Sequence, residues 1–161
     1  MSRKSLGVLV ALLLLSAGAL TAQVRTTKPN DVTISLGGRC IIWSFDYQRC
    51  LTPAFALDAS VSYIGGGNSE GSAGVFFLSG GAKYFMLKKP ASPYISAGLT
   101  WISAGTDAGP FGSDSASTVY FFASPGFEFR SEGGFVFRGG VYFLFKNSFF
   151  VWPGISLGIA F

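Results

Sequence analysis

The sequence lacks histidine and has few charged residues. Its 161 residues contain no histidine, which excludes a Ser-His-Asp triad, a Cys-His pair and a histidine-ligated metal site. Charged residues make up 12% of the chain, against about a quarter in an ordinary soluble domain. Because 49% of the residues are apolar, a large part of the surface is expected to face something other than water.

Clusters of basic residues are also missing. Beyond the N-terminus the lysines and arginines are scattered singly or in one pair, whereas a phosphate backbone is bound by clustered positive charge. The glycines at 65–67 and 71 do not follow the G-x-G-x-x-G spacing of a nucleotide site, and we predict that they form a flexible loop. We therefore predict no nucleic-acid partner, no metal and no cofactor.

The N-terminus has the parts of a secretory signal peptide. A basic start, MSRK, precedes an apolar stretch over 6–20 and small residues at Ala19 and Ala22. The alternative is a membrane anchor, but about 15 residues rise only about 22 Å as a helix, short of a roughly 30 Å hydrocarbon core. We predict a cleaved signal over 1–22, a polar tail over 23–30 and a single domain over 31–161.

The rest of the chain alternates apolar and polar residues with a period of two, which is typical of β-strands. In the segment AFALDASVSYI, over 54–64, every second residue is large or apolar, and no segment after the tail shows helical periodicity. Glycine, proline, asparagine and aspartate separate the runs. The pattern predicts eight strands, at 31–37, 40–49, 53–64, 73–87, 93–103, 116–130, 134–146 and 153–161.

The charges indicate which strand face points inward. The polar face carries few charges, of mixed sign, among serine, threonine and glycine, while the other face is long, aromatic and uncharged. That distribution is typical of strands with apolar residues towards lipid and polar residues inside, and an open sheet edge is not tolerated in hydrocarbon. The sequence thus predicts an all-β, eight-stranded antiparallel up-and-down transmembrane β-barrel. We expect an interior charge network of Asp46, Asp58, Lys83, Glu128 and Arg138.

Connection lengths and aromatic residues predict the orientation. Short turns alternate with longer connections, as expected for an even-stranded barrel with both termini inside. The first connection, around Gly37, Gly38 and Arg39, should be an outer loop but is very short. The outer connections contain Glu70, Asp107 and Asp114 and are mildly acidic. An aromatic belt at the two interfaces is predicted to comprise Trp43, Tyr47, Tyr63, Tyr84, Trp101 and Trp152.

The signal peptide, the eight amphipathic strands and the terminal aromatic residue resemble the small outer-membrane β-barrels of the OmpX and OmpA-transmembrane-domain type. SFDYQR, over 44–49, and PGFEFRSEGGFVFRGG, over 125–140, are similar to hairpin segments of such barrels. The resemblance implies the outer membrane of a Gram-negative-type bacterium, with outer-membrane lipid and the barrel-assembly machinery as partners. In such barrels a last strand like this one is the assembly signal, which here would be Ile155, Leu157, Ile159 and Phe161.

Interior carboxylates could serve acid–base chemistry, but a structural network is the favoured interpretation. Eight strands enclose room only for side chains, so interior charges must neutralise one another and an open channel is disfavoured. Cys40 and Cys50 bracket the second predicted strand. They would lie roughly 33 Å apart, whereas a disulfide needs Cα atoms within about 7 Å, so two free thiols are predicted.

The predicted function is structural or interactive, through the outer loops, with no catalysis and with an extracellular ligand that the sequence does not identify. The main alternative is a narrow passive transport barrel, or one that binds lipid or a small ligand. An enzyme would have to rely on Asp46, Asp58 or Glu128 as its base. A soluble periplasmic barrel would need the apolar faces inside, where eight strands cannot pack so many aromatic residues.

Overall fold

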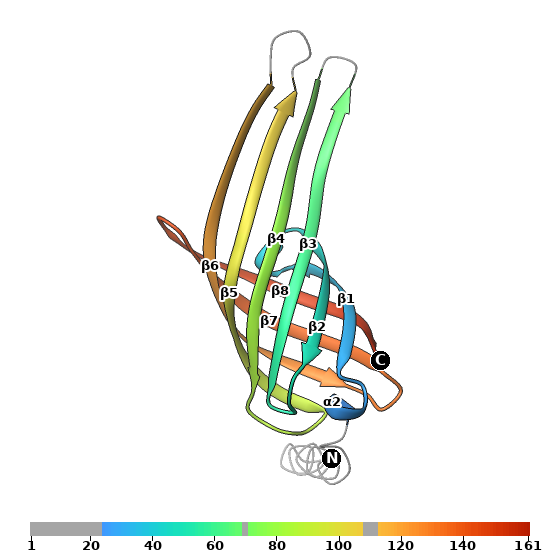
Figure 1. Ribbon diagram of the computed structural model, residues 1–161. Helices are drawn as coiled ribbons and strands as arrows, with labels where there is room; N and C mark the ends of the chain where they lie inside the picture. The colour runs from blue at the N-terminus through green and yellow to red at the C-terminus, as the bar shows by residue number, and fades with distance from the viewer. Residues whose placement is uncertain (1–23, 69–70, 108–112) are drawn as a thin grey trace, which may run out of the picture.

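The computed structural model describes residues 24–68, 71–107 and 113–161. In this part of the chain eight antiparallel strands, in chain order, form one closed barrel, as predicted (Figure 1). Here no helix is long and apolar enough to cross a membrane. The elements are α2 (Val24–Thr27), β1 (Asn30–Gly37), η1 (Gly38–Cys40), β2 (Trp43–Cys50), β3 (Phe55–Asn68), β4 (Gly71–Phe85), β5 (Ala91–Asp107), β6 (Ser113–Arg130), β7 (Phe135–Phe145) and β8 (Phe149–Ala160).

The alternation of residues along each strand separates the lumen from the exterior. In β3, Leu57 and Val61 are 47% and 41% exposed, while Asp58 and Ser60 between them are buried. The other strands repeat this pattern, so the exposed outer surface is formed by valine, leucine, isoleucine, phenylalanine and tyrosine. Such a surface is stable only against lipid, which confirms a membrane-spanning barrel with a polar interior.

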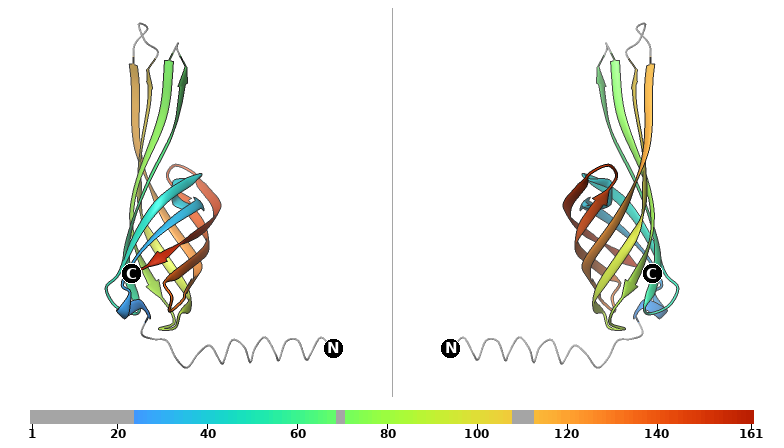
Figure 2. Two further views of the ribbon diagram at one scale, coloured as in Figure 1. Left: turned by 90° about the vertical axis from the view of Figure 1, so that its right-hand side faces the viewer. Right: turned by 90° about the vertical axis from the view of Figure 1, so that its left-hand side faces the viewer.

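Four strands continue far beyond the barrel. β3 and β6 have 14 and 18 residues, whereas β1 and β2 have 8 each. The β2–β3 pairing ends at Phe45↔Val61 and the β6–β7 pairing ends at Phe121↔Phe145. Beyond these pairs β3–β6 form a narrow four-stranded sheet, seen above the barrel in Figure 1 and rising from one side of it in Figure 2. We call this sheet, residues 62–68, 71–77, 102–107 and 113–118, the projection.

The projection corrects one prediction. The glycines at 65–67 and 71, expected to form a flexible loop, belong to β3 and β4. They are paired as Gly65↔Gly74, Gly66↔Ala73, Gly67↔Ser72 and Asn68↔Gly71. The register set by the barrel strands continues through them, because glycine carries no side chain that would interfere with a neighbouring strand. At about 3.3 Å per residue, the six or so residues of each strand carry the projection about 20 Å beyond the barrel.

The first connection turns into the barrel mouth. β2 begins at Trp43 rather than at residue 40, and Cys40 lies in η1. Gly37, Gly38 and Ile41 all have positive φ angles, of 75°, 74° and 71°, which bend the chain back sharply enough to bury Arg39 and Cys40. This turn explains why the first outer connection is so short. Cys40 and Cys50 are both free, as predicted.

Candidate functional site

The inner half of the lumen holds a dense set of ion pairs. Arg138 Nε lies 2.7 Å from Glu128 Oε2, and its Nη2 contacts Asp31. Arg130 also contacts Asp31, and its Nε lies 3.5 Å from Glu128 Oε1. Gln48 links this set to Lys83, because Lys83 Nζ donates to Gln48 Oε1 at 2.6 Å and Gln48 Nε2 donates to Glu128 Oε2 at 3.2 Å. All of these side chains are buried.

Arg25, in the segment predicted to be a polar tail, closes the inner end of the lumen. It is only 3% exposed, and its Nε donates to Glu128 Oε1 at 3.2 Å. Its Nη1 donates to the carbonyl of Lys89 at 2.7 Å, and its guanidinium lies 3.9 Å from the centre of the Phe85 ring. Burial lowers the pKa of Arg25, while the charge of Glu128 acts in the opposite direction. The short helix α2 is therefore anchored in the barrel by this arginine.

Arg39 closes the outer end in a similar way. Its guanidinium forms an ion pair with Asp58, which also lies 3.7 Å from Lys83 Nζ. The guanidinium lies 5.2 Å from the centre of the Phe122 ring. The Tyr120 hydroxyl donates to the Arg39 carbonyl and so holds the η1 backbone. Each end of the lumen thus receives an arginine from outside the strands, paired with a wall carboxylate.

The predicted charge network is present as a set of buried neighbours, with one difference. Ion pairs are formed by Asp58, Lys83, Glu128 and Arg138. Asp46 forms no ion pair with a cation among the described residues. Its carboxylate instead accepts hydrogen bonds from hydroxyl groups, at 2.8 Å from Ser44, at 3.4 Å from Thr33 and from Ser35. The whole set comprises five buried cations, Arg25, Arg39, Lys83, Arg130 and Arg138, and four buried carboxylates, Asp31, Asp46, Asp58 and Glu128.

Sequence reasoning missed several of these residues. Asp31 shares the polar face of β1 with Thr33 and Ser35, so the period of two could have identified it. Arg25 and Arg39 lie outside the alternating segments, and no sequence signal marks them as lumen residues. Among the described residues no group of three or more histidine, cysteine, aspartate or glutamate side chains is placed to hold a metal ion.

The predicted belt residues differ in their surroundings. Four are exposed on the outer surface, namely Tyr47, Tyr63, Tyr84 and Trp101, and Trp43 is half-buried beside Phe45. Trp152 is half-buried and follows the inward parity of β8, and its Nε1 donates to the Ile41 carbonyl at 2.6 Å. Its indole therefore holds the turn at the mouth, and its place in an interfacial belt stays a prediction.

The four residues of the predicted assembly signal lie on the lipid-facing side. Ile155, Leu157, Ile159 and Phe161 are between 51% and 67% exposed. Their strand, β8, pairs with β1 from Asp31↔Ala160 to Gly37↔Gly154 and closes the barrel. Recognition of this strand by an assembly machinery remains a prediction.

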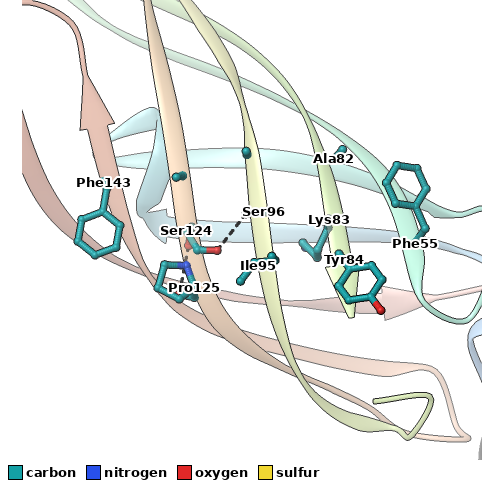
Figure 3. Close-up of a pocket in the computed structure, with 11 residues that line it drawn as sticks. Phe55, Ala82, Lys83, Tyr84, Ile95, Ser96, Ser124, Pro125 and Phe143 are labelled. Atoms are coloured by element: carbon teal, nitrogen blue, oxygen red, sulfur yellow. Dashed lines mark hydrogen bonds between the residues drawn. The ribbon is translucent and has the colours of Figure 1, made fainter. Parts of the chain in front are cut away.

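A shallow groove of about 460 Å³ crosses the lipid-facing surface of β3–β7 (Figure 3). Its floor is a row of small residues, paired as Ala82↔Ala97 and Ala97↔Ala123. Phe55, Tyr84, Ile95, Pro125 and Phe143 surround this floor. The lining is almost entirely apolar and faces hydrocarbon, so the groove is part of the lipid-contact surface.

A second hollow, which we call the trough, lies on the outward face of the projection. Its volume is about 360 Å³. Three glycines pair across neighbouring strands here, in the register Gly65↔Gly74↔Gly105, and the last two form the floor of the trough. The Tyr63 ring lies over the first two, since a Cβ on Gly74 would lie 2.7 Å from its hydroxyl oxygen. The rest of the lining is formed by Ser72, Ala73, Phe76, Ser103, Thr106, Asp114 and Ser115.

The fold is that of known outer-membrane barrels. The N-terminal β-barrel domain of Pseudomonas aeruginosa OprF superposes with a TM-score of 0.60 at 15% identity, over 82% of this chain and 95% of that domain. Ail of Yersinia pestis gives 0.46 at 13% identity, over 81% and 91%, and Neisserial surface protein A gives 0.45 at 15% identity, over 81% and 92%. No protein-family model and no curated protein matches the sequence. The chain therefore has the fold of the small eight-stranded outer-membrane barrels.

Proposed function

We propose that this barrel is a non-catalytic surface protein that recognises an extracellular partner through the projection. One observation carries the proposal: the lumen is closed by arginines at both ends, while four strands extend far beyond the length needed to span a bilayer. About 9–11 residues per strand cross the hydrocarbon core, and β5 and β6 have 17 and 18. The remaining residues can act only outside the membrane.

The filled lumen argues against the transport alternative. Passage along the axis would require Arg25 and Arg39 to leave Glu128 and Asp58, which would expose buried charges without partners. Breaking such a buried pair costs about 3–5 kcal/mol. A barrel that conducts would therefore open only rarely, whereas the projection is available at all times.

The test is a trimmed barrel in which residues 63–76 and 103–117 are each replaced by Asn-Gly. This turn suits a two-residue hairpin, so the Ser62↔Phe77 and Ile102↔Thr118 pairs are retained. We expect the trimmed barrel to keep its heat-modifiable gel migration. Cells that display it should lose adhesion to surfaces coated with mucin, collagen or polysaccharide, compared with cells displaying the full chain.

Equal adhesion by the trimmed and full-length barrels would contradict the proposal. A second measurement addresses transport directly. The purified full chain in a planar bilayer is expected to give no sustained conductance, and steady channels would favour the transport alternative instead.

A further inference from the structure

We propose that the trough on the projection is a binding site for an uncharged oligosaccharide. This inference rests on the proposed recognition function and names the class of partner. The trough lies on the exterior of the projection, and its volume of about 360 Å³ falls within the range of small-ligand sites, roughly 300–1,000 Å³.

Tyr63 forms a flat aromatic platform at one side of the trough. It is 58% exposed, and its ring lies along the sheet, because Gly65 and Gly74 leave the space that a Cβ would fill. Phe76 is the neighbour of Tyr63 in the register and packs edge-on against Trp101 at a centroid distance of 6.1 Å. An exposed aromatic face beside a side-chain-free floor matches the flat C–H face of a pyranose ring.

Hydroxyl groups surround the open part of the floor. The register places three serines, Ser72, Ser103 and Ser115, on the same face as Tyr63 and around Gly105. The floor at Gly105 is open, because a Cβ added there would have a backbone oxygen, at 3.9 Å, as its nearest neighbour. A serine hydroxyl both donates and accepts hydrogen bonds, as sugar hydroxyls do. Tyrosine, serine and glycine are also the residues that antibodies use most at recognition surfaces.

The charge of the region disfavours an anionic ligand. No lysine or arginine occurs in residues 50–82 or 90–129, which include the whole projection, while Asp107 and Asp114 lie within it. Sulfated or phosphorylated polymers would find no cation to pair with. Polyanions such as heparin are therefore expected to bind weakly or not at all.

A peptide is less well matched to this surface than a sugar. The backbone groups beneath the trough are paired in the β3–β4, β4–β5 and β5–β6 ladders, so this face offers no donors or acceptors for an added strand. The free edge of β3 passes through the glycines at 65–67, which present no side chains to select a peptide sequence. The experiment therefore includes extended peptides, which would reveal addition of a peptide strand at that edge.

The experiment measures binding of the full-length barrel to an array of neutral hexose and N-acetylhexosamine oligosaccharides, with heparin fragments and extended peptides as comparison probes. The barrel is kept in an amine-oxide detergent, since maltoside detergents are themselves neutral sugars. We expect saturable binding of at least one neutral oligosaccharide, and at least tenfold weaker binding by Tyr63→Ala. Tyr84→Ala, which removes an exposed tyrosine near the other rim, is the matched control and should bind normally.

Gly74→Val provides the second pair of variants. A valine there would occupy the trough and displace the Tyr63 ring, so binding should be lost. Gly66→Val is the control, because Gly66 lies on the opposite face of β3 and a Cβ there meets nothing within 4 Å. Both variants are checked for heat-modifiable migration, so that a folding defect is not read as a binding defect.

The outcomes separate this inference from the proposed function. If no neutral oligosaccharide binds, if only heparin or peptides bind, or if Gly74→Val binds as well as Gly66→Val, the inference is wrong. Cells carrying Gly74→Val would then still adhere while cells carrying the trimmed barrel would not, and the proposed function would stand. If the trimmed barrel also adheres, the proposed function itself fails.

Discussion

Phe161 and Asn30 exchange two backbone hydrogen bonds and so join the end of the chain to the start of β1. The Phe161 amide donates to the Asn30 carbonyl at 2.8 Å, and the Asn30 amide donates to the Phe161 carbonyl at 3.0 Å. The Phe161 ring is 58% exposed on the lipid-facing side. The last residue therefore has a backbone role in closing the barrel and a side chain that is free for another role.

Phe161→Ala separates these two roles, because it keeps both backbone hydrogen bonds and removes the ring. We expect the purified variant to refold in detergent with normal heat-modifiable migration. In cells the same variant should accumulate in the outer membrane at a level several-fold below the wild type, if the terminal aromatic residue is an assembly signal. The measurement is the amount of the heat-modifiable band in outer-membrane fractions.

Phe135→Ala is the control for that experiment. Phe135 is 49% exposed on the neighbouring strand and pairs with Ile159, so its loss removes a similar lipid contact from the same rim. Equal accumulation of the two variants would show that Phe161 contributes only lipid contact, and the assembly-signal prediction would be wrong.

Arg138→Met should destabilise the barrel by about 3 kcal/mol, because it leaves Asp31 and Glu128 buried with one cation fewer. Urea titration in detergent micelles, followed by the gel shift, measures the change in the free energy of unfolding. Adding Asp31→Asn should recover part of the loss, since one unpaired carboxylate is then neutral. Lys146→Met, at an exposed position of the β7–β8 turn, should have no measurable effect.

The faces of the strands could be predicted from the sequence because a strand alternates its side chains whatever its neighbours do. Parity places Leu57 and Asp58 on opposite faces, and the few charges of mixed sign on the polar face predict that Asp58 points inward; the structure confirms both placements. Eight alternating runs without a helical segment then left a closed barrel as the only way to keep backbone groups paired in lipid.

The parts that escaped prediction depend on turns and distant contacts. The entry of η1 into the mouth requires positive φ angles at Gly37, Gly38 and Ile41, and such a conformation at a β-branched isoleucine leaves no trace in the hydrophobic pattern. Arg25 meets Glu128 across 103 positions of the chain. The glycine-rich projection has the composition of a loop. It forms a sheet because the pairing of β3–β6 in the barrel continues through it in the same register.

The two cysteines should resist modification in the folded barrel. Cys40 and Cys50 are 0% and 6% exposed, and burial raises the pKa of the Cys40 thiol to about 11. The thiolate, which is the reactive form, is therefore scarce at Cys40 below that pH. Mass spectrometry after maleimide treatment at pH 7.5 should show no adduct on the folded barrel and two adducts in denaturant. An adduct at Cys40 of the folded barrel would mean that η1 leaves the mouth.

Gly37→Ala tests whether the turn is held in the mouth. Gly37 has a φ of 75°, and a Cβ there would collide with the Pro153 carbonyl oxygen. Backbone strain of this kind costs about 1–3 kcal/mol. The free energy of unfolding, and with it the urea midpoint, should therefore fall in the variant. Gly139→Ala is the control, because its added Cβ would meet only the Phe137 ring, at an ordinary 3.9 Å.

The same pair of variants bears on whether the lumen can open. If Gly37→Ala displaces η1, Arg39 is withdrawn from Asp58 and the outer end loses its closure. The variant should then give brief conductance events in a planar bilayer, while the wild type and Gly139→Ala remain silent. A destabilised but silent Gly37→Ala would mean that the remaining lumen side chains suffice to block the barrel, whereas an unchanged urea midpoint would contradict the strained turn itself.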